Sequence, residues 1–149
     1  MPKRTVISNT SCLIALTNIG KLDLLQKRYG RVVITPEVKA EFGEPLPAWI
    51  SVVAVKDELK TFLITKYLDL GEASTIALAT EMANPLIILD DGKARRYAKN
   101  INLNLTGTLG ILVKASEVGL ITDIFAVLAD LRKIQFRFPA DFADEWLNQ

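Results

Sequence analysis

The run L-I-I-L-D-D, residues 86–91, is the most strand-like segment of the chain. Four consecutive aliphatic residues predict a strand that is buried on both faces, as in the interior of a parallel sheet. The residues that follow directly are Asp90 and Asp91. We therefore expect a central strand whose carboxyl end carries at least one acidic side chain toward a cleft.

The segments on either side of this strand have helical patterns. Residues 72–83 are rich in Ala, Ser and Thr, small side chains that let a helix lie close to a sheet, and residues 92–101 predict a basic helix. Parallel strands separated by helices need crossover connections. The pattern therefore predicts a mainly parallel sheet that is covered on both faces.

The same alternation extends over the rest of the chain. Further strands are predicted at residues 4–8, 32–34, 51–55 and 102–106, with an additional edge strand at 136–138. Further helices are predicted at residues 11–19, 21–29, 36–42, 57–67, 109–118, 123–133 and 141–147. The predicted fold class is α/β, a three-layer α/β/α sandwich with a mainly parallel central sheet, in a single domain over residues 1–149.

The amino-acid composition limits which metals and partners the chain can bind. The chain has 18 Lys and Arg against 17 Asp and Glu, so any contact with nucleic acid must come from a local basic patch. Cys12 is the single cysteine and histidine is absent, which removes the usual ligands of structural zinc, iron–sulfur clusters and haem. A bound metal would be hard and oxygen-ligated. Without a signal peptide or a long apolar segment, we expect a cytoplasmic protein with no membrane contact.

Two glutamates lie on helix stripes that are otherwise apolar. Glu41 is close to the inward-facing stripe of the 36–42 helix, although the end of so short a helix can also reach solvent. Glu72 is in line with Ile76 on the next long helix, but Asp69 and Glu72 also have the spacing of a capping box. Each glutamate is thus a candidate metal ligand with a structural alternative.

The ends of two predicted strands add further candidates. One of Asp90 and Asp91 can cap the following helix, which leaves the other as a spare carboxylate, and acids crowded in one cleft would repel unless a cation bound there. Asn9 follows the first strand at the matching place, and it can either cap its helix or offer a neutral carbonyl oxygen to Mg²⁺.

Polar and basic residues beside these acids are suited to phosphate. Candidates for nucleic-acid binding are Thr10, Ser11, Lys93, Arg95, Arg96 and Thr108. Thr108 lies in the strand-to-helix turn T-G-T-L-G, where close packing explains the glycines equally well. The three basic residues lie on the 92–101 helix, where they could equally form a solvated surface.

Taken together, several segments resemble a bacterial, VapC-like branch of the PIN-domain nucleases. They are V-I-S-N-T-S-C-L-I-A-L, I-T-P-E-V-K-A-E-F, G-E-A-S-T-I-A-L-A, L-I-I-L-D-D-G-K-A-R-R-Y-A and T-G-T-L-G-I-L. The resemblance covers nearly the whole chain and implies a parallel α/β/α sandwich. It also implies an acidic site at one end of the sheet that binds Mg²⁺ or Mn²⁺ and hydrolyses RNA phosphodiester bonds.

The resemblance assigns the site residue by residue. The expected metal-binding and catalytic residues are Asn9, Glu41, Glu72, Asp90 and Asp91, with Asn9 where the family pattern has aspartate. A neutral side chain there should weaken the affinity for a dication. The predicted function is a metal-dependent endoribonuclease, the toxin of a toxin–antitoxin pair. The alternative is a catalytically weakened PIN-like module that binds RNA or protein.

Partners follow from the same resemblance: RNA, a small antitoxin protein and a second copy in a homodimer. Phe142, Trp146 and Leu147 on the last predicted helix could cover a dimer interface or the core. Other α/β families fit poorly. Receiver domains and D-x-D phosphatases place acids where this chain has Asn9, Thr10 and Ser11, and no G-x-G-x-x-G follows a strand.

Overall fold

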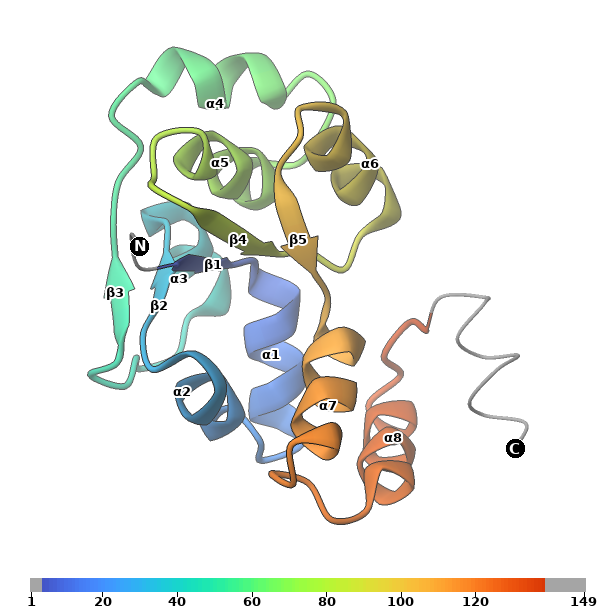
Figure 1. The fold of residues 1–149 in the computed structure, drawn as a ribbon. Helices are drawn as coiled ribbons and strands as arrows, with labels where there is room; N and C mark the ends of the chain where they lie inside the picture. Colours follow the sequence, from blue (N-terminus) through green and yellow to red (C-terminus); the bar gives the residue numbers. More distant parts are fainter. Residues whose placement is uncertain (1–3, 139–149) are drawn as a thin grey trace.

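Strand β4 (Pro85–Ile88) lies inside a parallel sheet, between β1 (Thr5–Ser8) and β5 (Asn104–Thr106). The computed structural model describes residues 4–138. Its five strands have the order β3-β2-β1-β4-β5, with β2 (Val32–Ile34) and β3 (Ile50–Val52) on the far side of β1. Every pairing is parallel, so the predicted parallel sheet is confirmed (Figure 1).

Successive residues of the inner strands point into two different cores. Val6 and Ile88 belong to one buried cluster, whereas their neighbours Ile7 and Ile87 belong to the other. All four side chains are almost completely buried. This alternation is why the strand sequences are apolar throughout rather than at every second position.

Helices cover both faces of the sheet. The first core is closed by α1 (Thr10–Asn18), α2 (Asp23–Tyr29), α3 (Pro36–Phe42), α7 (Thr108–Glu117) and α8 (Ile124–Lys133). The second is closed by α4 (Glu58–Ile64), α5 (Leu70–Ala79) and α6 (Gly92–Asn100). In Figure 1, α1, α2, α7 and α8 lie on one side of the strands and α4, α5 and α6 lie on the other, which confirms the three-layer α/β/α sandwich.

Helix α5 packs closely against its surroundings because its residues are small. Residues from Gly71 to Ala79, with the exception of Glu72, are buried. Where α3 begins, Thr35 accepts a hydrogen bond from the Val38 amide, and its hydroxyl lies 2.7 Å from the Ser74 hydroxyl of α5. Thr35 therefore caps α3, and the same hydroxyl joins α3 to α5.

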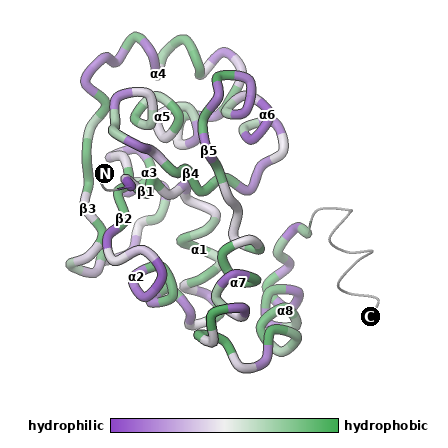
Figure 2. The backbone as a smooth tube through the Cα atoms, in the orientation of Figure 1, coloured by the Kyte–Doolittle hydropathy of each residue, from purple (hydrophilic) through white to green (hydrophobic). Residues whose placement is uncertain are grey.

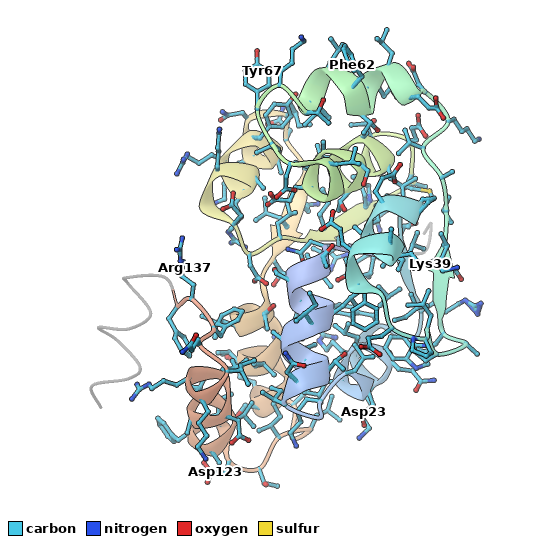
Figure 3. All side chains as sticks on the ribbon, turned by 180° about the vertical axis from the view of Figure 1, so that it is seen from behind. Asp23, Lys39, Phe62, Tyr67, Asp123 and Arg137 are labelled. Atoms are coloured by element: carbon cyan, nitrogen blue, oxygen red, sulfur yellow. The ribbon has the colours of Figure 1, made fainter. Side chains whose placement is uncertain are left out.

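Helices α4 and α6 form much of the outer surface on their side of the sheet. Figure 2 shows α6 as a largely hydrophilic segment. On α4 the side chain of Phe62 projects outward, as does Tyr67 just after the helix (Figure 3), and both residues are about 60% exposed. None of the helices within residues 4–138 is long and apolar enough to cross a membrane.

The predicted edge strand at residues 136–138 is wrong. These residues are neither strand nor helix, and the rings of Phe136 and Phe138 pack edge to face, 5.5 Å apart, against the first core. Aromatic side chains that fill a core do not need a strand backbone, so the apolar pattern was misleading. The predicted helix at 141–147, with Phe142, Trp146 and Leu147, lies outside the described residues.

Candidate active site

The carboxyl ends of three strands meet at one edge of the sheet. Ser8 of β1 is in register with Ile88 of β4, which is in register with Thr106 of β5. After β1 the chain adds β2 and β3 on one side of β1, and it later adds β4 and β5 on the other side, so the direction of strand addition changes between β1 and β4. Ligands of parallel α/β folds bind at such a change of direction, so the residues after β1 and β4 are placed for a site.

A pocket of about 320 Å³ opens at this edge, and we call it the acid pocket. It is lined by Asn9, Thr10, Ser11, Ile14, Glu41, Asp69, Glu72 and Asp91. Four of these residues carry carboxylates, and no basic residue is among them. The structure thus brings together four of the five sequence-predicted ligands and adds Asp69.

Helix starts hold two of the carboxylates in place. One oxygen of Asp91 accepts a hydrogen bond of 2.9 Å from the Ala94 amide and caps α6. Asp69 accepts one of 3.2 Å from the Glu72 amide and caps α5. A cap uses only part of a carboxylate's accepting capacity, so both can still offer oxygen to a ligand in the pocket.

Glu41 is fixed from two sides. The Thr10 hydroxyl donates a hydrogen bond of 3.0 Å to Glu41 Oε2. The carboxylate also lies so close to Gly71 that a Cβ atom there would overlap it. Glycine at the start of α5 therefore leaves the space in which the Glu41 carboxylate sits.

The carboxyl group of Glu72 has an unusual proton affinity. Burial raises the pKa of this group to about 8, and three neighbouring carboxylates add to the effect. They belong to Asp69, Asp91 and Glu41. Crowded acids hold a proton more tightly, and a bound cation would reduce their mutual repulsion.

Asn9 is the N-cap of α1, which confirms the structural alternative for this residue. Its Oδ1 accepts a hydrogen bond of 3.1 Å from the Cys12 amide, and its Nδ2 donates one of 3.0 Å to the Ser11 hydroxyl. The side chain is almost completely buried at the floor of the acid pocket. It therefore contributes a dipole at the place where an aspartate would contribute a charge.

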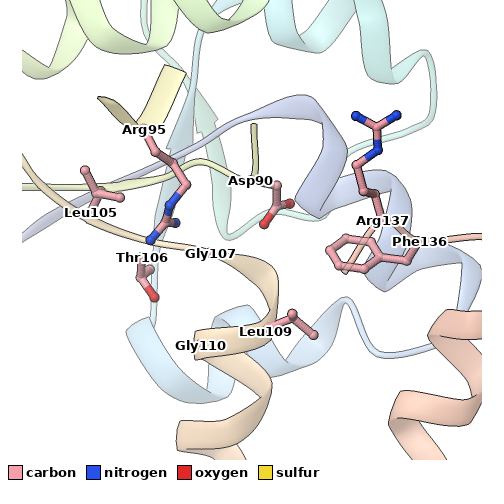
Figure 4. A pocket seen from close by; sticks show the side chains of 9 residues that line it. All are labelled: Asp90, Arg95, Leu105, Thr106, Gly107, Leu109, Gly110, Phe136 and Arg137. Atoms are coloured by element: carbon pink, nitrogen blue, oxygen red, sulfur yellow. The ribbon is translucent and has the colours of Figure 1, made fainter. Parts of the chain in front are cut away.

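Asp90 faces a different space from Asp91. One of its oxygens accepts a hydrogen bond from the Thr108 amide, and the other accepts bonds from the hydroxyls of Thr108 and Ser11, all at 2.7–2.9 Å. It lines a neighbouring pocket of about 350 Å³, where Figure 4 shows it between Arg95 and Arg137. Asp90 thus ties the ends of β1 and β4 to the start of α7.

The three basic candidates on α6 differ in their surroundings. Arg95 donates a hydrogen bond of 2.7 Å to the Leu89 carbonyl and lines the pocket beside Asp90. Lys93 and Arg96 are exposed to solvent. The Thr108 hydroxyl, another candidate for phosphate binding, is fully buried and donates to Asp90.

The hydrogen bonds of Asp90 give a stability prediction. Thr108→Val keeps the shape of the side chain but removes the hydroxyl that donates to the carboxylate. We expect the free energy of unfolding to fall by about 1.5–3 kcal/mol, the range for hydrogen bonds to charged groups. Urea denaturation measures it, with the exposed Thr122→Val as control. Equal stability of the two variants would contradict the role given to Thr108.

The donors in the acid pocket fit a hard divalent cation by their chemistry. They are carboxylate, amide and hydroxyl oxygens, the ligands that Mg²⁺ takes in proteins. Burial raises the pKa of the Cys12 thiol, so this fully buried cysteine supplies no thiolate. Within residues 4–138, no three acidic or cysteine side chains are already clustered as a metal site. The carboxylates share the pocket, and their oxygens would have to come closer together to bind one ion.

Sequence reasoning missed several lining residues. Asp69 was considered only as a helix cap, although a residue that caps α5 must lie where that helix opens onto the pocket. Phe136 and Arg137, beside Asp90, come from a segment after α8 that returns to the sheet edge. Only Asp69 had a signal in the sequence, because its spacing to Glu72 places both at the same helix start.

The chain matches a known protein family. A family model described as a PIN domain matches residues 5–149. No curated protein and no solved structure matches the chain.

Proposed function

The chain belongs to the PIN-domain family, and from this premise we propose that it is a metal-dependent endoribonuclease that hydrolyses RNA phosphodiester bonds. PIN domains are nuclease-type domains that act on nucleic acid and generally use divalent metal ions. The proposal goes further by naming RNA as substrate, Mg²⁺ or Mn²⁺ as cofactor, and the acid pocket as the site.

The observation that carries the proposal is the position of four carboxylates around one pocket at the change of direction between β1 and β4. Burial, with a smaller contribution from the neighbouring carboxylates, raises the pKa of Glu72 to about 8. Repulsion among these carboxylates costs free energy when no cation is bound, and the arrangement therefore favours cation binding.

We assign roles within this pocket. Glu41, Glu72 and Asp91 hold the cation, and Asp69 and Asn9 complete the set of oxygen donors. A bound divalent cation supplies activation of water and neutralises charge that develops on the phosphate. Asp90 acts as a positioning residue through its bonds to Ser11 and Thr108. Lys93 and Arg96 are exposed on α6, which Asp91 caps, and we assign to them contacts with the RNA backbone.

The proton on Glu72 leads to a prediction about pH. At pH 7, a carboxyl with a pKa of about 8 is mostly protonated in the cation-free protein. Cation binding needs the carboxylate, so Mn²⁺ should displace nearly one proton, and affinity should rise about tenfold per pH unit until it levels off above pH 8. Calorimetric titration with Mn²⁺ in two buffers of different ionisation enthalpy measures the proton release. Release that is unchanged in Glu72→Gln would assign the proton to another group.

Cleavage is tested with purified protein, Mn²⁺ and end-labelled RNAs of mixed sequence. We expect cuts inside the strands, no cuts in excess EDTA, and loss of activity in Asp91→Asn. The matched control is Asp23→Asn, which removes an exposed carboxylate on α2. Equal activity in the protein and in Asp91→Asn would attribute the cleavage to a contaminant.

Asn9 favours a second function, a PIN-like module that binds RNA or protein without cutting. A neutral residue at the floor of the pocket lowers the charge available to a dication. This alternative predicts no cleavage by the unmodified protein with either cation. Turnover of RNA together with Mn²⁺ binding at micromolar concentration would exclude it.

We also propose a cytoplasmic toxin of the VapC-like branch, held by a small antitoxin and forming a homodimer. This part rests on the resemblance of the sequence segments. Growth arrest on expression, relieved by a small protein encoded beside the chain, is the expected result. Normal growth with active cleavage in vitro would leave the nuclease proposal standing and exclude the toxin.

A further inference from the structure

Another polar pocket lies at the opposite edge of the sheet, where the strands begin. Its volume is about 580 Å³, larger than that of the acid pocket. We call it the arginine pocket, after Arg4, Arg28 and Arg31, which line it together with Thr5, Tyr29 and Ser51. Strand β1, four residues long, separates the two pockets by roughly 13 Å along the strand direction.

The charge of this pocket is uncompensated. Three guanidinium groups line it, and no carboxylate does. Within the part of the chain that the structure describes, none of the three forms an ion pair. The Nε atom of Arg28 is buried and has no hydrogen-bond partner among the described residues. A buried donor without a partner costs free energy, and an anion in the pocket would both supply the missing acceptor and neutralise positive charge.

The pocket also has features that would orient an anion. The Arg28 guanidinium lies over the ring of Tyr29, 5.4 Å from its centroid, which restrains the plane of its donors. Burial raises the pKa of Tyr29, so its phenol remains a hydrogen-bond donor at physiological pH. Thr5 and Ser51 can add hydroxyl donors from β1 and β3.

We propose that the arginine pocket binds a phosphorylated nucleotide, either free or at the 5′ end of an RNA strand. Arginine is the residue best matched to phosphate, because its planar fork donates two parallel hydrogen bonds. The volume is in the range of small-molecule sites, far above the need of a bare phosphate ion. The pocket lacks acidic residues, so binding needs no divalent cation and does not depend on cleavage.

The test is a titration of the full chain in EDTA, followed by amide NMR and calorimetry. AMP is expected to bind and to shift amide signals of Thr5, Gly30 and Ser51, while those of Glu41 and Glu72 stay in place. Adenosine, which lacks the phosphate, should bind at least about tenfold more weakly. RNA tetranucleotides with and without a 5′-phosphate distinguish the two sources of the ligand. Preferential binding of the phosphorylated strand indicates an RNA end, and binding of AMP alone indicates a free nucleotide.

Variants locate the binding. Arg28→Gln and Arg31→Gln should each weaken AMP binding about tenfold or more, since each removes charge-assisted hydrogen bonds. Arg28→Lys, which keeps the charge but loses the fork, should restore only part of the affinity. The matched control is Arg132→Gln, an exposed arginine on α8. Thermal melting checks that each variant is folded.

Three results would overturn the proposal: no AMP binding at millimolar concentration, AMP binding that Arg28→Gln and Arg31→Gln leave unchanged, or signal shifts confined to the acid pocket. Inorganic phosphate that binds as tightly as AMP would refute the nucleotide part. Because the titration contains EDTA, failure of Mn²⁺-dependent cleavage would not affect its outcome.

Discussion

Glu72→Gln is expected to lower Mn²⁺-dependent RNA cleavage by about a thousandfold, the effect of losing roughly 4 kcal/mol of transition-state stabilisation by a bound cation. Glutamine keeps the shape and the neutral charge that Glu72 has at pH 7, but it cannot become a carboxylate. The variant should therefore fold normally and fail to hold the cation. Single-turnover cleavage of a labelled RNA and a Mn²⁺ titration measure the two losses.

The same substitution should change the pH dependence of stability in a defined direction. The pKa of Glu72 is higher in the folded protein than in the unfolded chain, so ionising it opposes folding. The cation-free protein should lose stability as the pH rises from about 4.5 through 8, and Glu72→Gln should lose less. The exposed Glu44→Gln serves as control. Cleavage by Glu72→Gln at the control's rate would remove Glu72 from the site.

Asn9→Asp is expected to raise Mn²⁺ affinity by about tenfold or more, because it adds a formal charge to the set of oxygen donors. Aspartate caps helices as well as asparagine does, so the bond from the Cys12 amide should survive. The bond from Asn9 Nδ2 to Ser11 is lost, and a further buried charge joins the acids. The cation-free variant should therefore be less stable than the unmodified protein, and excess Mn²⁺ should reverse this difference.

This variant also tests whether Asn9 limits cleavage. If the unmodified protein is a weakened nuclease, Asn9→Asp should cut RNA faster. The matched control is Asn104→Asp, an exposed position on β5. Unchanged Mn²⁺ affinity together with unchanged cleavage would show that Asn9 does not limit the site.

The sheet was predictable because its strands carry strong local signals. The aliphatic run before Asp90 can pack only between two covered faces, and the small residues of α5 permit close approach to the sheet. Thr35 followed by Pro36 fixed the start of α3 to the residue. These features depend on residues that are close together in the sequence, so they can be recognised without a structure.

The sequence could not predict that the side chains of Asp90 and Asp91 line different pockets. Both follow the same strand, and the path of the turn decides which pocket each side chain enters. The sequence left one aspartate as a cap and the other as a spare ligand. In the structure the cap, Asp91, lines the acid pocket, while the hydroxyls of Ser11 and Thr108 bind Asp90. Hydrogen bonds from hydroxyls that are far from Asp90 in the sequence produce no periodic pattern that the sequence alone could reveal.

The strand order has a consequence for synthesis of the protein. The acid pocket joins residues from Asn9 to Asp91, and its two halves come together only when β4 pairs with β1. A chain still being translated therefore has no complete acid pocket until the residues through Asp91, more than half of the chain, have left the ribosome. Under the proposed function, RNA cleavage by this pocket begins only after that point in synthesis.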